Sequence, residues 1–363
     1  MKLGDHLEFR SGRGVPPRRA DGGFPGFPGF PVYGANGALG YATEHNTSGP
    51  VIVVGRVGTY CGSVRYCDSD VWVTDNAFAC RAKNPEETRY WYYALQTCRL
   101  NEHRAGSGQP LLNQTILRDL PVRAVAVRDR HRIGALLGAV DDKIAANNRV
   151  IEVAEALMVC FVESVSEQVS LSSLASRSSV FLDSADFADT VAHFSLPAFD
   201  DGARPQLVAG ASIRSGKFLL SQPCVLFAKL NPRIPRIWNV LDLPAAMALA
   251  SSEFVVLTSA SVDSSVLWAA LRQPEVSETL QQHVVGTSGS HQRIHPRDLF
   301  DVRVRDVRRL NPHDAQAIAA LGALCHVRRG ESAQLSAYRD TLLPLLISGE
   351  VRVGDPSTAE TLA

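Results

Sequence analysis

Hydrophobic residues recur in a seven-residue pattern between Arg128 and Val169. They alternate in steps of four and three, which is the seam of a coiled coil, and neither proline nor glycine occurs in this stretch after Gly138. The seam positions are Ile133, Leu137, Val140, Ile144, Asn147, Ile151, Ala154, Met158, Phe161 and Val165. Because a lone helix would leave this stripe in water, the pattern predicts that the helix packs against a partner.

A second stretch, Pro312–Ser348, has the same spacing and is the predicted partner. Its seam positions are Ala317, Leu321, Leu324, Arg328, Glu331, Leu335, Tyr338, Leu342 and Leu345. Asn147, Arg328 and Glu331 are polar, so burial destabilises the seam unless they meet polar partners. One interpretation is that they pair across the helices and fix their register; the other is that they lie at the margin of the seam.

A strand-rich segment precedes each helix, so the chain is organised as globule, helix, globule, helix. We predict an α+β fold in which two tandem-related α/β domains are separated by a long antiparallel two-helix coiled coil. The predicted boundaries are 1–124 for the first domain, 125–169 for the first helix, 170–310 for the second domain, 311–350 for the second helix and 351–363 for a C-terminal tail.

The first domain shows short strand signals separated by turns. The segment Gly22–Pro31 is too rich in glycine and proline for a helix or a central strand. The predicted elements are an edge strand at the N-terminus, strands at Leu39–Thr43, Val51–Val54 and Ala77–Arg81, a hairpin formed by Val64–Tyr66 and Val71–Thr74, a helix at Arg89–Leu100 and an exit strand near Leu120–Val127.

Four short matches, in the same order in both halves, indicate a tandem duplication. The matches are RDL at Arg118–Leu120 and Arg297–Leu299, the Gly/Ser-rich loops Gly106–Gln114 and Gly286–Ile294, WYYAL at Trp91–Leu95 with LWAAL at Leu267–Leu271, and two apolar runs that place Arg56 and Lys229 similarly. If a two-fold axis relates the repeats, their helices run antiparallel. A helix of about 37 residues measures roughly 55 Å, which corresponds to some sixteen base pairs of DNA at most.

Composition places the chain among globular proteins. It has 363 residues, of which 45% are hydrophobic, and 37 basic residues balance 37 acidic ones. Only five bases are lysine, namely Lys2, Lys83, Lys143, Lys217 and Lys229. Arginine suits bidentate contacts with phosphates and guanine edges, although a GC-rich genome would also favour its codons. Zero net charge argues mildly against a stand-alone nucleic-acid binder.

The seven cysteines are scattered and contain no C-x-x-C pair, so we predict reduced, mostly buried thiols and no metal site. The sequence contains no apolar run of about 20 residues and no signal-peptide h-region at its start, which predicts a cytoplasmic protein without membrane contact.

Eight motifs follow one another in an order that is typical of a known family. They are YGANGALGY (Tyr33–Tyr41), VGRVGTYCGSV (Val54–Val64), VTDNAF (Val73–Phe78), GSGQPLLNQ (Gly106–Gln114), DDKIAANNRVIEVAEAL (Asp141–Leu157), SLPAFDDGARP (Ser195–Pro205), AKLNPRIPRIW (Ala228–Trp238) and YRDTLLPLLISGEVRV (Tyr338–Val353). With the two helices in place, the chain resembles the specificity (S) subunit of type I restriction-modification systems over nearly its whole length.

The resemblance implies two target-recognition domains that read a split site on double-stranded DNA. It also implies docking of methyltransferase (modification) subunits, two in number, and of a restriction/motor subunit. The chain would have no cofactor of its own, because S-adenosylmethionine would be held by the methyltransferase. It would therefore be a non-catalytic subunit of a methyltransferase/endonuclease complex.

Candidate DNA-binding residues lie in the glycine- and proline-containing loops. They are Arg56, Tyr60, Gln109, Asn113, Gln114, Lys229, Asn231, Arg233, Arg236 and Arg293. Arginine and lysine suit phosphates, and amides suit adenine edges. Each group has a structural alternative: Arg56 and Tyr60 in a β-turn, and the three amides of the first loop in capping or partner docking. His291, Gln292 and His295 are further candidates for base reading, and Asp141, Asp142 and Lys143 are predicted to form a solvated or partner-facing stripe.

Motifs for chemistry are missing from the sequence. It contains no G-x-x-x-x-G-K-[ST] phosphate loop and no [DN]-P-P-[YF] adenine-methylation motif. Three other interpretations remain: a DNA-specificity subunit of a single-chain, type II-like restriction-methylation enzyme, a tandem protein-interaction scaffold without DNA binding, and an unrecognised nuclease. Salt titration of duplex binding separates the scaffold from the DNA readers.

Overall fold

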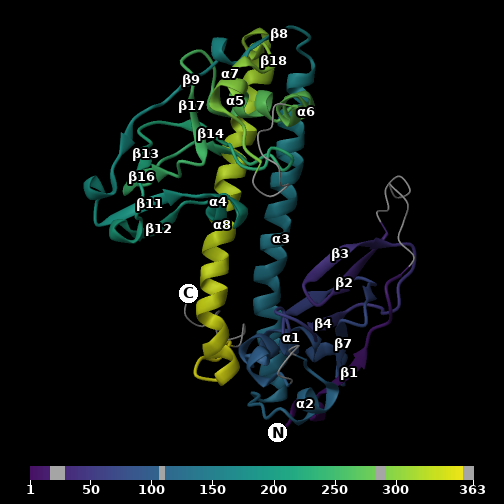
Figure 1. Ribbon diagram of the computed structural model, residues 1–363. Helices are drawn as coiled ribbons and strands as arrows, with labels where there is room; N and C mark the ends of the chain where they lie inside the picture. Colours follow the sequence, from purple (N-terminus) through teal and green to yellow (C-terminus); the bar gives the residue numbers. More distant parts are fainter. Residues whose placement is uncertain (17–28, 106–110, 283–291, 355–363) are drawn as a thin grey trace, which may run out of the picture. The chain divides into compact units, whose positions relative to one another are not determined.

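The structure, a computed structural model, describes residues 1–16, 29–105, 111–282 and 292–354. The chain forms two compact units, which we call unit 1 (Met1–Lys143 with the chain from Leu335 onward) and unit 2 (Ile144–Gln334). Both mix helices with sheets, as predicted (Figure 1). The two long helices, α3 (Val127–Glu163) and α8 (Pro312–Ser348), each contribute a part to both units.

Unit 1 contains two sheets. Its strands are β1 (Leu7–Ser11), β2 (Phe30–Gly34), β3 (Gly37–Ala42), β4 (Val51–Gly55), β5 (Val64–Cys67), β6 (Trp72–Val73) and β7 (Ala77–Ala82), and its short helices are α1 (Thr88–Thr97) and α2 (Gln114–Asp119). The main sheet is antiparallel with the order β1-β7-β4-β5, and a smaller sheet has the order β3-β2-β6.

Strand β4 is buried on both faces, which explains its continuous apolar sequence VIVVG. On one face, Ile52 and Val54 belong to a core completed by the aromatic side of α1, including Tyr90 and Trp91. On the other face, β4 packs against the β6 segment of the smaller sheet. Strand β4, in the interior of the main sheet, is thus covered on both sides.

Several local predictions for unit 1 were wrong. Val64–Tyr66 and Val71–Thr74 do not form a hairpin, because β5 pairs with β4 and β6 pairs in parallel with β2. Pro31 lies in β2, the central strand of the small sheet, where β6 pairs only with the two residues that follow it. The missing N–H of Pro31 therefore costs no ladder bond on that side. The predicted exit strand between Leu120 and Val127 is absent, and α3 begins there instead.

Unit 2 contains a main sheet with the same layout as that of unit 1. The order is β9-β17-β14-β15, with every neighbouring pair antiparallel. A five-stranded sheet, β10-β13-β16-β11-β12, covers one of its faces, and β8 pairs with β18. The strands are β8 (Gln168–Ser170), β9 (Ser176–Arg177), β10 (Phe181–Leu182), β11 (Thr190–Phe194), β12 (Gln206–Ala209), β13 (Lys217–Leu219), β14 (Cys224–Ala228), β15 (Ile237–Val240), β16 (Met247–Ala250), β17 (Phe254–Thr258) and β18 (Arg303–Arg305).

Four short helices complete unit 2: α4 (Leu196–Asp200), α5 (Ser264–Leu271), α6 (Pro274–Gln282) and α7 (Pro296–Asp301). Helix α5 is buried along its whole length and packs on the main sheet with Met158 and Val162 of α3 and Ile318 of α8. Each main sheet is therefore covered by one short helix and by parts of both long helices.

Within each unit, α3 and α8 contact each other in antiparallel directions. In unit 1, Leu137 shares a core with Leu343, and Asp141 accepts a hydrogen bond from Arg339 at 2.7 Å. Asp142 binds Arg89 at 2.6 Å, and Gly138 makes this possible, because a Cβ there would lie 2.5 Å from the Arg89 guanidinium. The predicted solvated or partner-facing stripe is thus wrong for Asp141, which is half-buried in its ion pair with Arg339. It holds for Asp142, whose side chain stays 59% exposed although it pairs with Arg89.

In unit 2, the polar residue of the α3 seam has partners on α8. Asn147, which is 2% exposed, donates to Glu331 at 3.0 Å and to Ser332 at 3.3 Å. Glu331 also accepts from Arg328 at 2.8 Å. Pairing across the helices is therefore the correct interpretation for Asn147 and Glu331.

Two details of the predicted helices need correction. Helix α3 ends at Glu163 rather than near Val169, because the chain then turns into β8, which pairs with β18. On α8, Tyr338 is 67% exposed, whereas the next residue, Arg339, faces Asp141. The buried stripe of α8 passes through Ile318, Cys325, Leu343 and Leu346, so the predicted seam is rotated from the true one over part of the helix.

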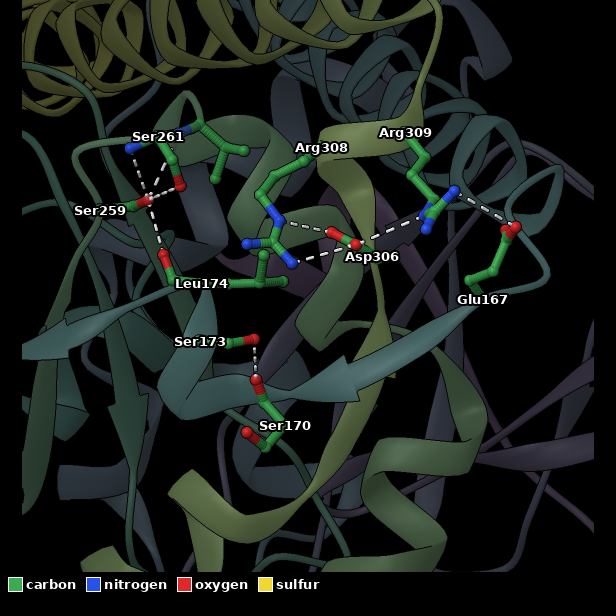
Figure 2. Close-up of polar contacts among 10 residues, drawn as sticks. Glu167, Ser170, Ser173, Leu174, Ser259, Ser261, Asp306, Arg308 and Arg309 are labelled. Atoms are coloured by element: carbon green, nitrogen blue, oxygen red, sulfur yellow. Dashed lines mark hydrogen bonds and ion pairs between the residues drawn. The ribbon is translucent and has the colours of Figure 1, made fainter.

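A polar network holds together the segment that follows α3 and the segment that precedes α8 in unit 2. Figure 2 shows Asp306 between two arginines: Arg308 donates to it at 2.6 and 3.0 Å, and Arg309 lies 3.5 Å away. Arg309 also reaches Glu167, which follows α3. Hydrogen bonding by Arg308 lowers the pKa of Asp306. The network joins the segment after α3 to the segment before α8.

Candidate nucleic-acid interface

The loop between β4 and β5 lies at one end of the main sheet of unit 1, and it is tied to the segment that precedes α2. Arg56 donates its N–H to the carbonyl of Asn76 at 3.0 Å and accepts from Leu112 at 2.9 Å. Val57 also forms a β-bridge with Leu111. The loop and the start of α2 therefore form one surface at this end of the sheet.

In unit 2, the loop between β14 and β15 repeats these contacts residue for residue. Lys229 donates its N–H to the carbonyl of Glu253 at 2.8 Å and accepts from Ile294 at 3.0 Å. Leu230 forms the bridge, here with Arg293. Arg56 and Lys229 thus occupy equivalent positions in the two loops, as their sequence neighbourhoods predict.

Both loops turn through a residue with left-handed backbone conformation. Gly58 has φ of 72° and Asn231 has φ of 54°, the two residue types that adopt this conformation most readily. The turn is closed by Cys61 N–H to Gly58 at 3.1 Å in one loop and by Ile234 N–H to Asn231 at 3.0 Å in the other. The same backbone therefore presents different side chains at its tip.

The tip side chains face solvent. Tyr60 is 55% exposed in unit 1, and Ile234 is 58% exposed in unit 2, where Arg233 beside it is also exposed. Among the described residues, no ion pair or side-chain hydrogen bond is formed by Arg233. Tyr60 and Arg233 are therefore accessible to a ligand such as DNA, as the sequence predicts.

Arg56 is less available than its sequence suggests. Its guanidinium carbon lies 4.9 Å from the centre of the Phe78 ring, and its Nε is buried without a hydrogen-bond partner in the described part of the chain. This geometry favours the structural alternative, in which the side chain stacks on Phe78 and stabilises the turn.

Two amide side chains at the end of the Gly106–Gln114 loop have partners inside the protein. Asn113 is the N-cap of α2, with its side-chain oxygen accepting from Ile116 at 2.8 Å, so the capping interpretation is correct for this residue. Gln114 donates to Ser11 at 3.2 Å and accepts from Arg118 at 3.1 Å. Gln109 and His291 lie outside the residues that the structure describes.

A charged cluster surrounds Lys229 in unit 2. Arg293 binds Glu253 at 2.9 and 3.3 Å, and Arg177 lies close enough to influence Lys229. Burial lowers the pKa of the Lys229 ammonium; Glu253 opposes this shift, whereas Arg177 and Arg293 add to it. The cluster has three cationic side chains and one carboxylate, which suits an anionic ligand. No sequence signal marks Arg177 or Glu253, because only the pairing of distant strands brings them to Lys229.

The remaining predicted residues of the second loop have defined contacts. Arg236 forms a bidentate ion pair with Asp200 of α4, at 2.7 and 3.0 Å, which stabilises the loop against the rest of unit 2. Asn231 donates its N–H to the carbonyl of Gln292 at 2.8 Å. His295 is the N-cap of α7, as Asn113 is of α2.

The predicted seam residues of the long helices are largely shielded from solvent. Ile133, Leu137, Asn147, Ile151 and Met158 are buried. Those that are half-buried are Val140, Ile144, Leu321, Leu335 and Leu342.

The N-terminal part of the chain matches a known family. Residues 1–156, which include the first loop and most of α3, match the family described as "Type I restriction modification DNA specificity domain". This match covers 156 of the 363 residues, so it shows that the N-terminal part of the chain is similar to this family. None of the curated proteins compared with the chain matches it.

A solved structure shares the fold of this chain. The crystal structure of a type I restriction-modification system S subunit from M. genitalium covers 96% of this chain and 95% of its own, with a TM-score of 0.61 and 14% identity. The HsdS subunit from Thermoanaerobacter tengcongensis covers 97% of this chain and 96% of its own, with a TM-score of 0.31 and 13% identity. At 14% identity, the likeness to the M. genitalium subunit shows the fold alone.

The seven cysteines are unpaired, and five of them are buried, as predicted; Cys160 is exposed. Within the described ranges, no group of three or more histidine, cysteine, aspartate or glutamate residues is arranged to hold a metal ion. Across the same ranges, no helix combines the length and apolar character needed to cross a membrane.

Proposed function

We propose that this chain reads a DNA target in two parts, with the loop surface of unit 1 binding one part and that of unit 2 binding the other. The family match of residues 1–156 supports DNA recognition within a type I restriction-modification system. The observation that carries the two-part proposal is the matched pair of loops, each with the same backbone bonds and the same left-handed turn but with different tip residues.

The proposal includes a tandem duplication of the two domains. Several equivalences support it: the two main sheets have the same strand order, and Leu3 binds the carbonyl of Leu120 as Leu171 binds that of Val302, both at 3.0 Å. The RDL match does not belong among them. Counted from the N-caps of α2 and α7, the buried Leu117 corresponds to Leu299, so the two RDL triplets are out of step by about one helical turn.

The two long helices are proposed to act as an antiparallel coiled-coil spacer between the two readers. Each has 37 residues, which corresponds to roughly 55 Å of helix at 1.5 Å per residue. A spacer of this kind would require an unread gap between the two half-sites. The proposed domains are 1–124 and 170–310 and the proposed tail is 351–363, while the two spacer helices take the bounds 127–163 and 312–348.

The same proposal assigns the chemistry to partners. This chain would dock two methyltransferase subunits, which would hold S-adenosylmethionine, and a restriction/motor subunit, and it would perform no catalysis itself. A type II-like partner enzyme is the second possibility, since the loops would read DNA in the same way. The chain would act in the cytoplasm, where its DNA target lies.

Mapping of methylated sites in host DNA, with and without this chain, tests the proposal. We expect a split motif that disappears when the chain is removed. Substitution of the tip residues of one loop should relax only one half of the motif. A continuous motif, or a split motif in which both halves change together, would contradict two independent readers.

Salt dependence tests the alternative of a scaffold without DNA contact. The complex of the full chain with its methyltransferase should bind duplex DNA with an affinity that falls steeply as salt increases, because each phosphate contact releases counterions. A flat response would favour the scaffold.

A further inference from the structure

A basic groove lies on the face of the main sheet of unit 1, beside the loop between β4 and β5, which we call the reading loop. Its walls include Arg10 and Arg13 near the end of β1, Arg81 of β7, and the segment Asn46–Ser48. Glu8 is the one acidic side chain among the residues that line it. We propose, on the basis of the proposed DNA-reading function, that this groove binds phosphodiester groups of one DNA strand.

The strand register explains why the charges gather there. In the antiparallel pair β1-β7, Glu8 faces Arg81 and Arg10 faces Ala79. Because side chains alternate along a strand, Glu8 and Arg10 share one face, while Leu7 and Phe9 enter the core on the other. Arg81 and Arg10 are thus held on one face by the sheet itself, with small Ala79 between them leaving the space open.

The wall opposite the strands is fixed by internal hydrogen bonds. The Asn46 side chain donates to the carbonyl of Val73 at 2.8 Å and accepts from the N–H of Val73 at 2.9 Å. Thr47 exchanges two backbone bonds with Val71, at 2.9 and 3.1 Å. A preformed groove of this kind binds an anion without first having to order its walls.

A glycine sets the end of the groove. A Cβ at Gly12 would lie 2.1 Å from the carbonyl oxygen of Thr74, so no other residue fits without moving the backbone. This close approach carries the chain from β1 to Arg13, whose N–H binds the carbonyl of Val73 at 3.0 Å. Ser11, also in the wall, accepts from Gln114 at the start of α2. The groove therefore continues into the surface that contains the reading loop.

The guanidinium groups remain available to a ligand. Arg10 is 3.4 Å from Glu8 and both side chains are largely exposed, so the attraction between them is weak in water. Arg81 donates to the carbonyl of Ser48, which leaves other N–H groups of its guanidinium for a phosphate. Three arginines against one glutamate give the groove a positive charge that suits a polyanion.

Unit 2 lacks this groove chemistry. Its strands place Ser176 opposite Thr258, in the positions that Glu8 and Arg81 hold in unit 1, and the two hydroxyls lie 3.2 Å apart. Ser178 stands where Arg10 would be. Within the described strands, the arginines of the groove are therefore found in unit 1 and are replaced by serine and threonine at the equivalent positions of unit 2.

The test uses the full chain in complex with its methyltransferase, a duplex carrying the mapped target and a duplex of equal length without it. Arg10→Ala with Arg81→Ala should weaken binding to both duplexes by the same factor. The slope of log affinity against log salt should fall by about 1.8, or about 0.9 for each phosphate that the variant no longer neutralises. Glu8→Gln, the matched control on the same strand, should strengthen binding to both duplexes.

Three results would overturn the groove proposal: an unchanged slope and affinity in the folded double variant, a weaker affinity for the target duplex alone, or weaker binding by Glu8→Gln. Arg81→Lys should keep most of the affinity, and an equal thermal midpoint shows that a variant is folded. Failure of the proposed function is a different result, since the unaltered complex would then show no salt dependence.

Discussion

The two loop surfaces share a backbone and differ in chemistry. Unit 1 presents an aromatic ring, Tyr60, on a turn that contains Gly58, whereas unit 2 presents a cation, Arg233, on a turn that contains Asn231. The position before the turn is occupied by an arginine stacked on Phe78 in unit 1, and by Lys229 inside a charged cluster in unit 2. A shared framework of hydrogen bonds therefore allows the readers to diverge, because the tip side chains carry no structural duty.

Substitution of the left-handed turn residues, Gly58 and Asn231, should produce the largest difference in recognition between the two half-sites. Gly58→Val forces a branched side chain into the left-handed region at a cost of about 1–2 kcal/mol, although a Cβ there meets no atom within 4 Å. We expect recognition of one half-site to be abolished. Asn231→Gly keeps the turn and should preserve recognition of the other half. Methylation mapping of both variants measures this, and loss of both half-sites in Gly58→Val would point to global unfolding.

Exchange of the tip residues for alanine should distinguish their roles. Tyr60→Ala should weaken binding by roughly 1–3 kcal/mol if the ring packs on DNA, with an unchanged salt slope. Arg233→Ala should lower the slope by about one unit for one phosphate contact. Equal slopes in the two variants would show that the loops do not differ in charge contacts. Duplex affinity measured across a salt series gives both values.

Lys229 should make DNA binding by unit 2 sensitive to alkaline pH. Since burial lowers the pKa of this ammonium, it loses its charge at a lower pH than an ordinary lysine, and affinity should fall as pH rises through that value. The same titration relieves the cost of burying the charge, so it raises stability of the folded chain slightly. Lys229→Arg should remove the fall, because arginine stays protonated. If the unaltered chain and Lys229→Arg lose DNA affinity equally as pH rises, Lys229 does not contact DNA.

The helix contacts give the smallest expected effect. Asn147→Leu should raise stability by about 1 kcal/mol, because an apolar residue replaces a buried amide and Glu331 keeps Arg328 as a partner. The thermal midpoint measures this. If Asn147 fixes the register of the helices, mapped motifs from the variant will show more than one gap length between the half-sites. A single gap length would show that Asn147 destabilises the helix pair without fixing its register.

Interaction partners set the limits of prediction for single residues. Asn113 has the sequence position of a base reader, and the structure makes it a helix cap. Arg236 looks available in a proline-containing turn, yet Asp200, far away in sequence, binds it. Tyr338 follows the seven-residue pattern, yet the helix faces its partner through Arg339. In each case a group from another element decided the outcome.

The two long helices and most strands of the first main sheet could be predicted from the residue pattern, because periodicity depends on neighbours along the chain. The resemblance to the family rests on local motifs, which are visible at the same level. The equivalence of Arg56 and Lys229 was also visible at that level. The pairing of the strands was not, and it produces the matched loops, the cluster around Lys229 and the groove of Arg10 and Arg81. Those sites combine residues from separate strands, and strand register is fixed by burial of whole faces rather than by any local signal.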